Sequence, residues 1–217
     1  MIGIFGGTFD PVHYGHIKPV LSIKQALSLS SLRFIPNRIP PHREVPWLST
    51  DQRLALLRSA LRDYSNVVID ERELERDGPS YMVDTLASLR DDFPDESLCL
   101  IIGMDAFMGI TSWFEWKQLF DLCHLVVTTR PGFDKNELID QVDSNNYQFL
   151  TTRMVEQGTA LSPNETGEIL LQSVPQLNIS STEIRANWLK DEIVRQWMPE
   201  AAYQKLREIK YDPEHEH

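Results

Sequence analysis

The amino-acid sequence predicts an α/β fold: a doubly wound parallel sheet with a small C-terminal helical subdomain. Short apolar, β-branched runs recur along the chain, and stretches with the length and period of amphipathic helices separate most of them. Such alternation is typical of a parallel sheet with helices on both faces, whose strands are apolar on both sides. The residues after 178 contain helical patterns without another strand-like run, which predicts the helical subdomain.

The elements of the sheet domain follow from these runs in chain order. Strands are predicted at Ile2–Phe5, Leu32–Ile35, Val67–Ile69, Leu98–Ile102, Leu125–Thr128 and Ile169–Val174. Helices are predicted at about 15–28, 50–62, 81–92, 113–122 and 134–142. The polar stretch from about 143 to 166 is predicted to be a loop or irregular structure. In open sheets of this kind, ligands bind beyond the carboxyl ends of the strands.

The C-terminal segment is predicted to form three successive helices, from ISSTEIRANWLK, EIVRQWM and PEAAYQKLREI. Pro199 suits the first position of the last helix, because the N–H that proline lacks has no partner there. We therefore expect an α/β domain over residues 1–178 and a helical appendage over residues 179–217 that packs on the same domain.

Composition limits the classes of function. Lys and Arg number 21 and Asp and Glu number 32, so the net charge is −11, which argues against binding of bulk nucleic acid. No run of about eighteen apolar residues is present, so no membrane span is expected. The N-terminus lacks the pattern of a secretory signal. Cys99 and Cys123 lie in apolar, strand-like segments, as buried thiols of a cytoplasmic protein do.

A charged run, ERELER, extends from Glu71 to Arg76. Charges of both signs in so short a run are typical of a solvated surface. We expect this segment to lie on the surface and to have no functional role.

The stretch from Gly3 to His16, GIFGGTFDPVHYGH, is the most informative part of the sequence. A strand ends there in Gly6 and Gly7, which let phosphate oxygens approach the backbone closely, and a helix start with open N–H groups is an anion site. Three interpretations are open for His13 and His16: phosphate contacts that stabilise a transition state, structural capping, or a zinc pair, for which no third ligand stands at a recognisable spacing. The pattern matches neither the dinucleotide fingerprint nor the P-loop.

A second motif, ISSTEIR from Ile179 to Arg185, begins the C-terminal helices. Ser180 has a glutamate at capping-box distance, so one interpretation is a well-capped helix. The other is an anion clamp, since serine hydroxyls, free backbone amides and the Arg185 guanidinium together suit polyphosphate oxygens. The sequence leaves both interpretations open.

These two motifs, in this order on an alternating strand–helix chain, resemble those of the nucleotidylyltransferase superfamily with a T/H-x-G-H loop. The middle of the chain is similar to the bacterial nicotinate-mononucleotide adenylyltransferases within that superfamily. The motifs that carry this similarity are IPNRIPPHR (35–43), PSYMVDTL (79–86), IIGMDAF (101–107), WFEW (113–116) and TRPG (129–132). The resemblance runs from residue 2 to about residue 185 and implies a Rossmann-like sheet.

The resemblance implies a reaction and the residues that carry it. ATP and nicotinate mononucleotide would give deamido-NAD and pyrophosphate, with Mg²⁺ bound largely through nucleotide and water. Because the attacking group is already a phosphate anion, the protein needs no general base and has to align two anions and neutralise developing charge. The residues implied as catalytic are His13, His16 and Arg185. Those implied to bind ATP or its phosphates are Gly6, Gly7, Thr8, Phe9, His42, Arg43, Ile179, Ser180 and Ser181.

The pyridine end of the site is also implied by the resemblance. Trp113 would stack on the nicotinate ring, and backbone amides near Tyr81–Thr85 would receive its carboxylate. Asp105, after Gly103, would bond ribose hydroxyls. Arg130, in the TRPG motif, completes the set of residues implied to bind nicotinate or ribose.

Several alternatives stay open. From the residues alone, Trp113 and Trp116 at i,i+3 spacing also fit core packing. A sister enzyme would use another phosphate acceptor, such as nicotinamide mononucleotide or pantetheine phosphate. A non-catalytic nucleotide sensor with the same fold would have no need of both histidines and Arg185. The sequence sets neither the preference between nicotinate and nicotinamide nor the oligomeric state.

Overall fold

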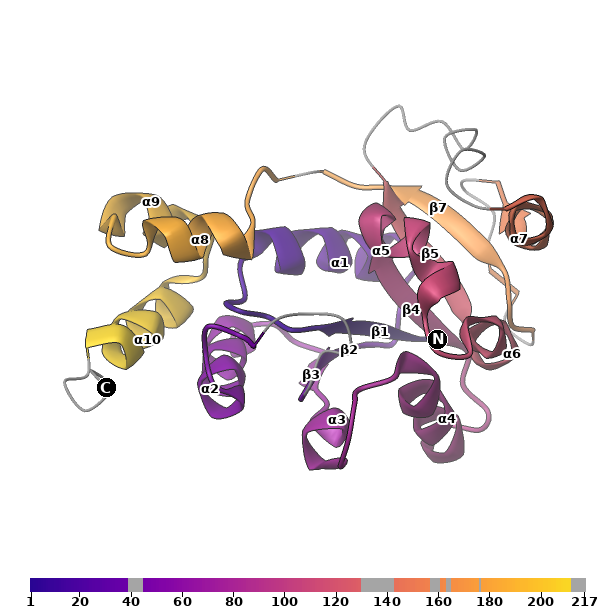
Figure 1. Ribbon diagram of the computed structural model, residues 1–217, viewed down its shortest axis with the longest axis horizontal. Helices are drawn as coiled ribbons and strands as arrows, with labels where there is room; N and C mark the ends of the chain where they lie inside the picture. The colour runs from indigo at the N-terminus through magenta and orange to yellow at the C-terminus, as the bar shows by residue number, and fades with distance from the viewer. Residues whose placement is uncertain (39–44, 130–142, 157–160, 163–164, 176, 212–217) are drawn as a thin grey trace.

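The computed structural model describes residues 1–38, 45–129, 143–156, 161–162, 165–175 and 177–211. Its centre is a seven-stranded sheet in the order β3-β2-β1-β4-β5-β7-β6, with every strand pair parallel (Figure 1). The strands are β1 (Ile2–Gly7), β2 (Ser31–Pro36), β3 (Val67–Ile69), β4 (Leu98–Gly103), β5 (His124–Thr129), β6 (Met154–Val155) and β7 (Ile169–Ser173). The predicted doubly wound, Rossmann-like sheet is confirmed. Its strand order reverses between β1 and β4, the place where such sheets bind ligands.

Helices connect the strands and cover both faces of the sheet. The α-helices are α1 (Tyr14–Ala26), α2 (Thr50–Leu61), α3 (Arg72–Glu75), α4 (Met82–Asp92), α5 (Met104–Met108), α6 (Leu119–Leu122), α7 (Ser144–Thr151), α8 (Ser181–Asn187), α9 (Asp191–Trp197) and α10 (Glu200–Tyr211), and the 3-10 helices are η1 (Ile110–Ser112) and η2 (Trp116–Gln118). Along β4, Cys99 and Ile101 join the core that contains α1 and α2, whereas Leu100 and Ile102 join the core that contains α4 and α6. This alternation buries both faces of the sheet.

The C-terminal helices α8, α9 and α10 gather at one end of the molecule, where α10 packs beside α2 (Figure 1). Ile184, Val194 and Leu206 from these helices are buried in the same core cluster as Ile17 of α1 and Leu56 of α2. The three predicted helices are therefore present and share the core of the sheet domain. The domain boundary between residues 178 and 179 stays a prediction.

The polar stretch 143–166, which was expected to be irregular, contains α7 and the short strand β6. The carboxylate of Asp143 caps α7 by accepting hydrogen bonds from the N–H groups of Asn145 and Asn146. The polar residues that suggest a loop therefore begin a helix. The short β6, only two residues long, carries no period that a sequence pattern could reveal.

The helix predicted at 113–122 is present only in its second half. The backbone of Trp113 is extended, and Glu115 has a left-handed φ of 49°, so regular turns begin only with η2. The helix predicted at 134–142 lies outside the described residues.

Within the charged run 71–76, the prediction of a solvated surface is wrong for Arg72 and Glu73. Glu73 is 3% exposed, and Arg72 donates hydrogen bonds to Asp70, Ser88 and Asp92. Arg72 and Glu73 therefore have partners inside the protein, whereas Glu75 is exposed. A helix of four residues is too short to show an amphipathic period, which is why the sequence pattern did not reveal it.

Two further expectations concern the thiols and the membrane. Cys99 and Cys123 are free and buried, as predicted, and burial raises the pKa of both thiols. They act as small apolar side chains on opposite faces of the sheet. Among the described residues, no helix is long and apolar enough to cross a membrane.

Candidate active site

A cleft opens at the carboxyl ends of β1 and β4, where the strand order reverses. It has two lobes, whose shared wall is formed by Phe5, Gly6, Gly7, Thr8, Gly103, Asp105 and Ala106. The smaller one, which we call the tryptophan lobe, has a volume of about 420 Å³ and is lined by Tyr81 and Trp113 among others. The larger one, the histidine lobe, has a volume of about 810 Å³, and His16, Ser181 and Arg185 line it. The cleft thus offers two adjoining spaces.

The loop after β1 is shaped by one strained residue. Phe9 has a φ of 51°, a left-handed conformation that costs an L-residue about 1 kcal/mol. Its ring is buried against Phe5 and Phe34, and this burial offsets the strain. The resulting turn places Gly7 and Thr8 in the wall of both lobes and leads the chain into α1.

His13 and His16 lie side by side at the start of α1, with ring centroids 3.8 Å apart. His13 is the N-cap residue, and its N–H donates a hydrogen bond to Nδ1 of His16 at 3.3 Å. His13 is 4% exposed, and burial lowers its pKa to about 4, so its imidazole is neutral at pH 7. His16 lines the histidine lobe. Among the described residues, no group of three His, Cys, Asp or Glu side chains could hold a metal ion.

Gly15 makes the close packing at this helix start possible. A Cβ atom at position 15 would lie 2.8 Å from Nδ1 of His13 and 3.0 Å from the carbonyl oxygen of Ile179. Both distances are shorter than van der Waals contact. The loop and the segment before α8 can approach each other this closely only because residue 15 has no side chain.

Two hydrogen bonds join the loop to α8. The Arg185 guanidinium donates to the carbonyl oxygen of Asp10 at 2.7 Å, and the Ser181 hydroxyl donates to the carbonyl oxygen of Pro11 at 3.0 Å. Ser181 and Pro11 are 170 residues apart in the sequence. The two motifs singled out in the sequence therefore meet at the edge of the histidine lobe.

The carboxylate of Asp10 adds a third segment to this junction. It accepts hydrogen bonds from the N–H groups of Trp47 at 2.7 Å and Leu48 at 2.9 Å. Asp10 is buried, so these charge-assisted bonds are protected from water. The segment that leads into α2 is thereby fixed beside the histidine lobe, which Trp47 lines.

The two serines of the ISSTEIR motif differ in position: one caps the helix, and the other faces the cleft. Ser180 caps α8: its hydroxyl accepts a hydrogen bond from the N–H of Glu183, and the Glu183 carboxylate accepts from Ser180. Ser181 and Arg185 face the histidine lobe. Ile179 packs against the core and contributes its carbonyl near Gly15. The capped-helix interpretation is confirmed for Ser180, and an anion clamp remains a prediction for the other two.

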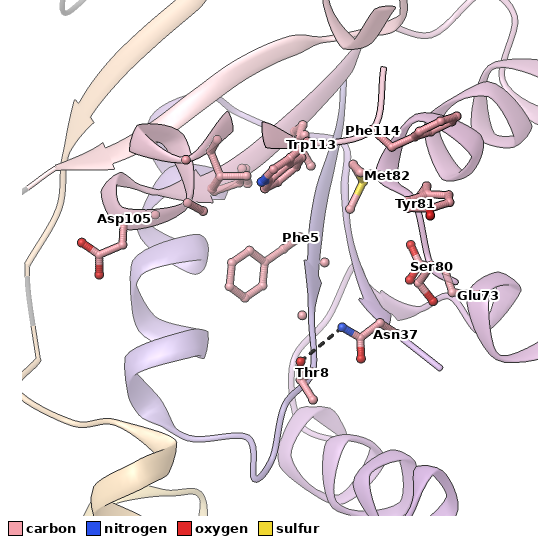
Figure 2. Close-up of a pocket in the computed structure, with 18 of the residues that line it drawn as sticks. Phe5, Thr8, Asn37, Glu73, Ser80, Tyr81, Met82, Asp105, Trp113 and Phe114 are labelled. Carbon is pink, nitrogen blue, oxygen red and sulfur yellow. Dashed lines mark hydrogen bonds between the residues drawn. The ribbon is translucent and has the colours of Figure 1, made fainter. Parts of the chain in front are cut away.

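The tryptophan lobe is lined mainly by aromatic and apolar side chains (Figure 2). Tyr81 and Phe114 stack with ring centroids 4.6 Å apart, and Trp113 and Met82 line the same lobe. Trp116 instead packs on the rings of the α6–α7 core. The two tryptophans thus separate: Trp116 belongs to the core, whereas Trp113 faces the cavity.

Thr85 lies behind this cavity and does not line it. Its side chain is fully buried, and its hydroxyl donates a hydrogen bond of 2.6 Å to Glu73. Glu73 itself lines the tryptophan lobe beside Ser80 and Tyr81. Burial raises the pKa of Glu73, and hydrogen bonds from the side chains of Thr85 and Ser80 oppose that shift.

Arg53 and Asn37 shape the wall of the cleft and were not identified from the sequence. Arg53 is 1% exposed, and its guanidinium donates to the carbonyl oxygens of Thr8 at 2.7 Å and Asn37 at 2.9 Å. The Asn37 amide in turn donates to the Thr8 hydroxyl. Burial lowers the pKa of Arg53, and the charge of Asp10 opposes that shift. The signal that could have revealed Arg53 is an arginine one turn before Leu56 and Leu57 on the apolar side of α2.

Most of the residues predicted for the site meet in this cleft. The structure brings together Gly6, Gly7, Thr8, Phe9, His16, Tyr81, Gly103, Asp105, Trp113, Ser181 and Arg185, all of which line one lobe or both. His13, Ile179, Ser180 and Thr85 lie next to that wall without forming it. His42, Arg43 and Arg130 lie outside the described residues.

Comparison with known proteins agrees with this geometry. A family model described as cytidylyltransferase-like matches residues 4–187. A protein of Halorhodospira halophila named probable nicotinate-nucleotide adenylyltransferase is 44% identical over 207 residues, 95% of this chain and 93% of that one. A protein of Methylococcus capsulatus with the same name is 43% identical over 202 residues, 93% of this chain and 94% of that one.

Solved structures show the same fold. The nicotinic acid mononucleotide adenylyltransferase of Plasmodium falciparum, in complex with NaAD, superposes with a TM-score of 0.69. The superposition covers 98% of this chain and 96% of that one, at 17% sequence identity. At this identity the likeness concerns the fold alone.

Proposed function

The chain belongs to the cytidylyltransferase-like family, among the nicotinate-nucleotide adenylyltransferases, and from this premise we propose how its cleft carries out their reaction. The enzyme transfers the adenylyl group of ATP to nicotinate mononucleotide. A phosphate oxygen of nicotinate mononucleotide attacks the α-phosphorus of ATP, and the bond from that phosphorus to the bridging oxygen breaks. Deamido-NAD forms, and pyrophosphate leaves with the electron pair. No proton has to be removed from the nucleophile.

The observation that carries the proposal is the junction between the loop after β1 and α8. Arg185 and Ser181 are fixed at the edge of the histidine lobe by hydrogen bonds to backbone carbonyls of Asp10 and Pro11. The same lobe is lined by His16 and by the glycines at the end of β1. Cation, hydroxyl and imidazole groups from two distant segments thus converge on one space, which suits the triphosphate of ATP.

We assign the donors of the histidine lobe to distinct parts of the triphosphate. His16 contacts the phosphate under attack, and Arg185 with Ser181 holds the departing pyrophosphate. His13 lies behind the wall of this lobe and is neutral because of its low pKa, so it supports His16 at the start of α1 and adds no positive charge. Gly6 and Gly7 let the phosphates approach the backbone. In this assignment the protein positions two anions and stabilises charge in the transition state.

The tryptophan lobe is the proposed site of the pyridine nucleotide. Trp113 offers a ring face for stacking, and Asp105, in the wall between the lobes, is placed to accept hydrogen bonds from a ribose. Tyr81, the residue before α4, has no side-chain cap, so the first-turn N–H groups of α4 can receive the nicotinate carboxylate. This end of the lobe would set the preference for nicotinate over nicotinamide.

We propose further that Mg²⁺ arrives with ATP, coordinated by phosphate oxygens and water. In this proposal the metal is part of the nucleotide substrate and neutralises its charge, and the side chains described above act on the complex. We also propose a cytoplasmic location, which fits the two free, buried cysteines.

The test is release of pyrophosphate by the purified protein with MgATP and a panel of acceptors: nicotinate mononucleotide, nicotinamide mononucleotide and pantetheine phosphate. We expect the highest kcat/KM with nicotinate mononucleotide. Preference for another acceptor would assign the chain to a sister enzyme. Binding of ATP without turnover of any acceptor would identify a nucleotide sensor and contradict the proposal.

A further inference from the structure

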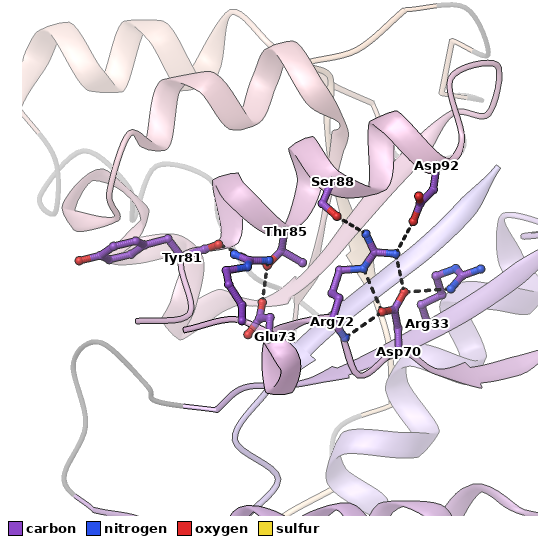
Figure 3. A network of polar contacts seen from close by, with 9 residues as sticks. Arg33, Asp70, Arg72, Glu73, Tyr81, Thr85, Ser88 and Asp92 are labelled. Atoms are coloured by element: carbon purple, nitrogen blue, oxygen red, sulfur yellow. Dashed lines mark hydrogen bonds and ion pairs between the residues drawn. The ribbon is translucent and has the colours of Figure 1, made fainter. Parts of the chain in front are cut away.

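Two polar ties join α3 to α4 (Figure 3). Only one of them includes a residue that lines the cleft. The inner tie is the hydrogen bond from the Thr85 hydroxyl to the Glu73 carboxylate, one turn from the N-terminus of α4. The outer tie runs from Arg72 to Ser88 and Asp92, near the C-terminal end of α4. The same pair of helices is therefore held at both ends, but only one end meets the cavity.

The two residues of the inner tie are almost fully buried. Glu73 is 3% exposed and Thr85 is 0% exposed. The Thr85 hydroxyl also accepts a hydrogen bond from Arg76 at 3.1 Å, so a carboxylate, a hydroxyl and a guanidinium form a chain. Such a chain holds its members in one arrangement, because breaking the link from Thr85 takes a hydrogen-bond donor from the buried Glu73 carboxylate.

The inner tie also adjoins the tryptophan lobe directly. Glu73 lines that lobe next to Ser80 and Tyr81, the two residues that lead into α4. Figure 2 shows the Glu73 and Ser80 side chains close together at the Tyr81 end of the cavity. The backbone carbonyl of Tyr81 accepts from the amide of Thr85, so Thr85 is bonded to the first residue of this turn and to Glu73 at once.

The outer tie belongs to a network that joins the two helices to the sheet. The Arg72 guanidinium holds the Asp70 carboxylate with two hydrogen bonds, at 2.9 Å and 3.1 Å, and the Arg33 guanidinium of β2 also donates to it. Burial works against ionisation of Asp70, but the bonds from Arg72 and Arg33 prevail and hold the pKa of this carboxyl below its usual range. This network fastens α3 and the far end of α4 to the sheet. Its members line neither lobe of the cleft.

We propose that Thr85 and Glu73 are positioning residues for the pyridine nucleotide: together they fix the first turn of α4 so that its N–H groups meet the carboxylate of the ring. The inference rests on the proposed function, which places the pyridine nucleotide in the tryptophan lobe. Thr85 acts through Glu73 and the backbone of Tyr81 and does not touch the substrate. Backbone donors discriminate between carboxylate and amide only when they are held in place, since a small displacement loses the hydrogen bonds.

The test compares Thr85→Val, which removes the hydroxyl at nearly constant volume, with Thr85→Ser, which keeps it. For Thr85→Val we expect the KM and the Kd for nicotinate mononucleotide to rise about tenfold, the loss typical of a hydrogen bond to a charged group. The KM for ATP should stay the same, and the advantage of nicotinate over nicotinamide mononucleotide should shrink. Thr85→Ser should restore wild-type values to within about twofold. Thr85→Ala removes the same hydroxyl and replaces Thr85→Val in these measurements if that variant fails to fold.

The matched control is Ser88→Ala, which removes one bond of the outer tie between the same two helices. It should lower Tm without changing either KM. If Thr85→Val lowers Tm and leaves the KM for nicotinate mononucleotide unchanged, or raises both KM values equally, the positioning role is refuted. Calorimetry of the wild-type protein measures binding of nicotinate mononucleotide directly. It distinguishes failure of the proposed function from failure of the positioning role. Binding of nicotinate mononucleotide without turnover overturns the proposed function alone, and absence of binding overturns both.

Discussion

The loop after β1 and the charged segment around α3 handle polar groups in opposite ways. Around the loop, His16 of α1 and Ser181 and Arg185 of α8 face an open lobe, and the buried His13 is kept neutral. In the charged segment, Arg72 and Asp70 form hydrogen bonds with each other and with nearby side chains. From this comparison we expect the groups that face the cavity to act on ligands, and the groups that bond to one another to position the elements around it.

The largest expected effect is on kcat, from a substitution beside the loop after β1. His16→Ala should lower kcat roughly 100- to 1,000-fold, the range for removal of one donor that stabilises a transition state. The Tm should fall as well, because the His16 side chain also accepts the hydrogen bond from the N–H of His13 at the start of α1. Steady-state pyrophosphate release measures kcat. A kcat within about threefold of wild type would show that His16 has no such role.

The second prediction concerns the buried neighbour in the same loop. The folded pKa of His13, about 4, lies below its ordinary value of 6.5, so as the pH falls the unfolded chain takes up the proton first. The contribution of His13 is therefore complete above about pH 6.5 and is lost as the pH falls toward 4. Its full size is about 3 kcal/mol.

Urea unfolding at pH 7.5, 5 and 4 measures this loss. His13→Asn keeps a good N-cap without a group that titrates in this range, so its stability should fall less over the same pH range. The difference between the two pH profiles isolates His13 from the carboxylates that titrate near pH 4. Parallel profiles would contradict a buried, neutral histidine.

The third prediction addresses the buried cation that joins the ends of β1 and β2. Arg53→Met leaves the carbonyl oxygens of Thr8 and Asn37 without their donor and should lower the free energy of unfolding by about 2 kcal/mol. The KM for ATP should rise as well, because Thr8 lies in the wall of the histidine lobe. Arg53→Lys keeps the charge but not the planar guanidinium. Its stability and its KM for ATP should lie between those of the wild type and of Arg53→Met. Wild-type stability and a wild-type KM for ATP in Arg53→Met would contradict this role of Arg53.

The smallest expected effect is in the outer tie. Asp92→Asn weakens the ion pair with Arg72, but the Asp92 side chain is 55% exposed, so solvent screens the pair. We expect a loss of less than about 1 kcal/mol of stability and unchanged kinetics with both substrates. A change in the KM for nicotinate mononucleotide would show that the outer tie reaches the cleft, and the contrast between the two ties would fail.

The sequence predicted the sheet and the loop well because both depend on local patterns. Apolar runs mark the strands, and Gly6, Gly7, His13 and His16 stand close together in a motif. The partners of these residues come from distant segments, and only the resemblance to a family linked Arg185 to the loop. The carbonyls of Asp10 and Pro11 as the contact points could be found only in the structure.

The sequence failed where burial contradicts composition. Glu73 and Arg53 are charged residues in positions that are almost fully buried, and each is accommodated by partners far away in the chain. A short charged helix carries no period, so the run 71–76 was indistinguishable from a solvated surface. The capped helix α7 was missed for a related reason, because Asp143 and the residues after it are typical of loops.

The central claim is that the loop sets the chemical step and the α3–α4 junction sets binding of the pyridine nucleotide. The most direct test is a double-mutant cycle of His16→Ala and Thr85→Val, measured as kcat/KM for nicotinate mononucleotide. We predict that the two losses multiply, with a coupling energy below about 0.5 kcal/mol, as for independent sites. A coupling energy of about 1 kcal/mol or more would contradict the claim, because it would show that both residues act on the same step.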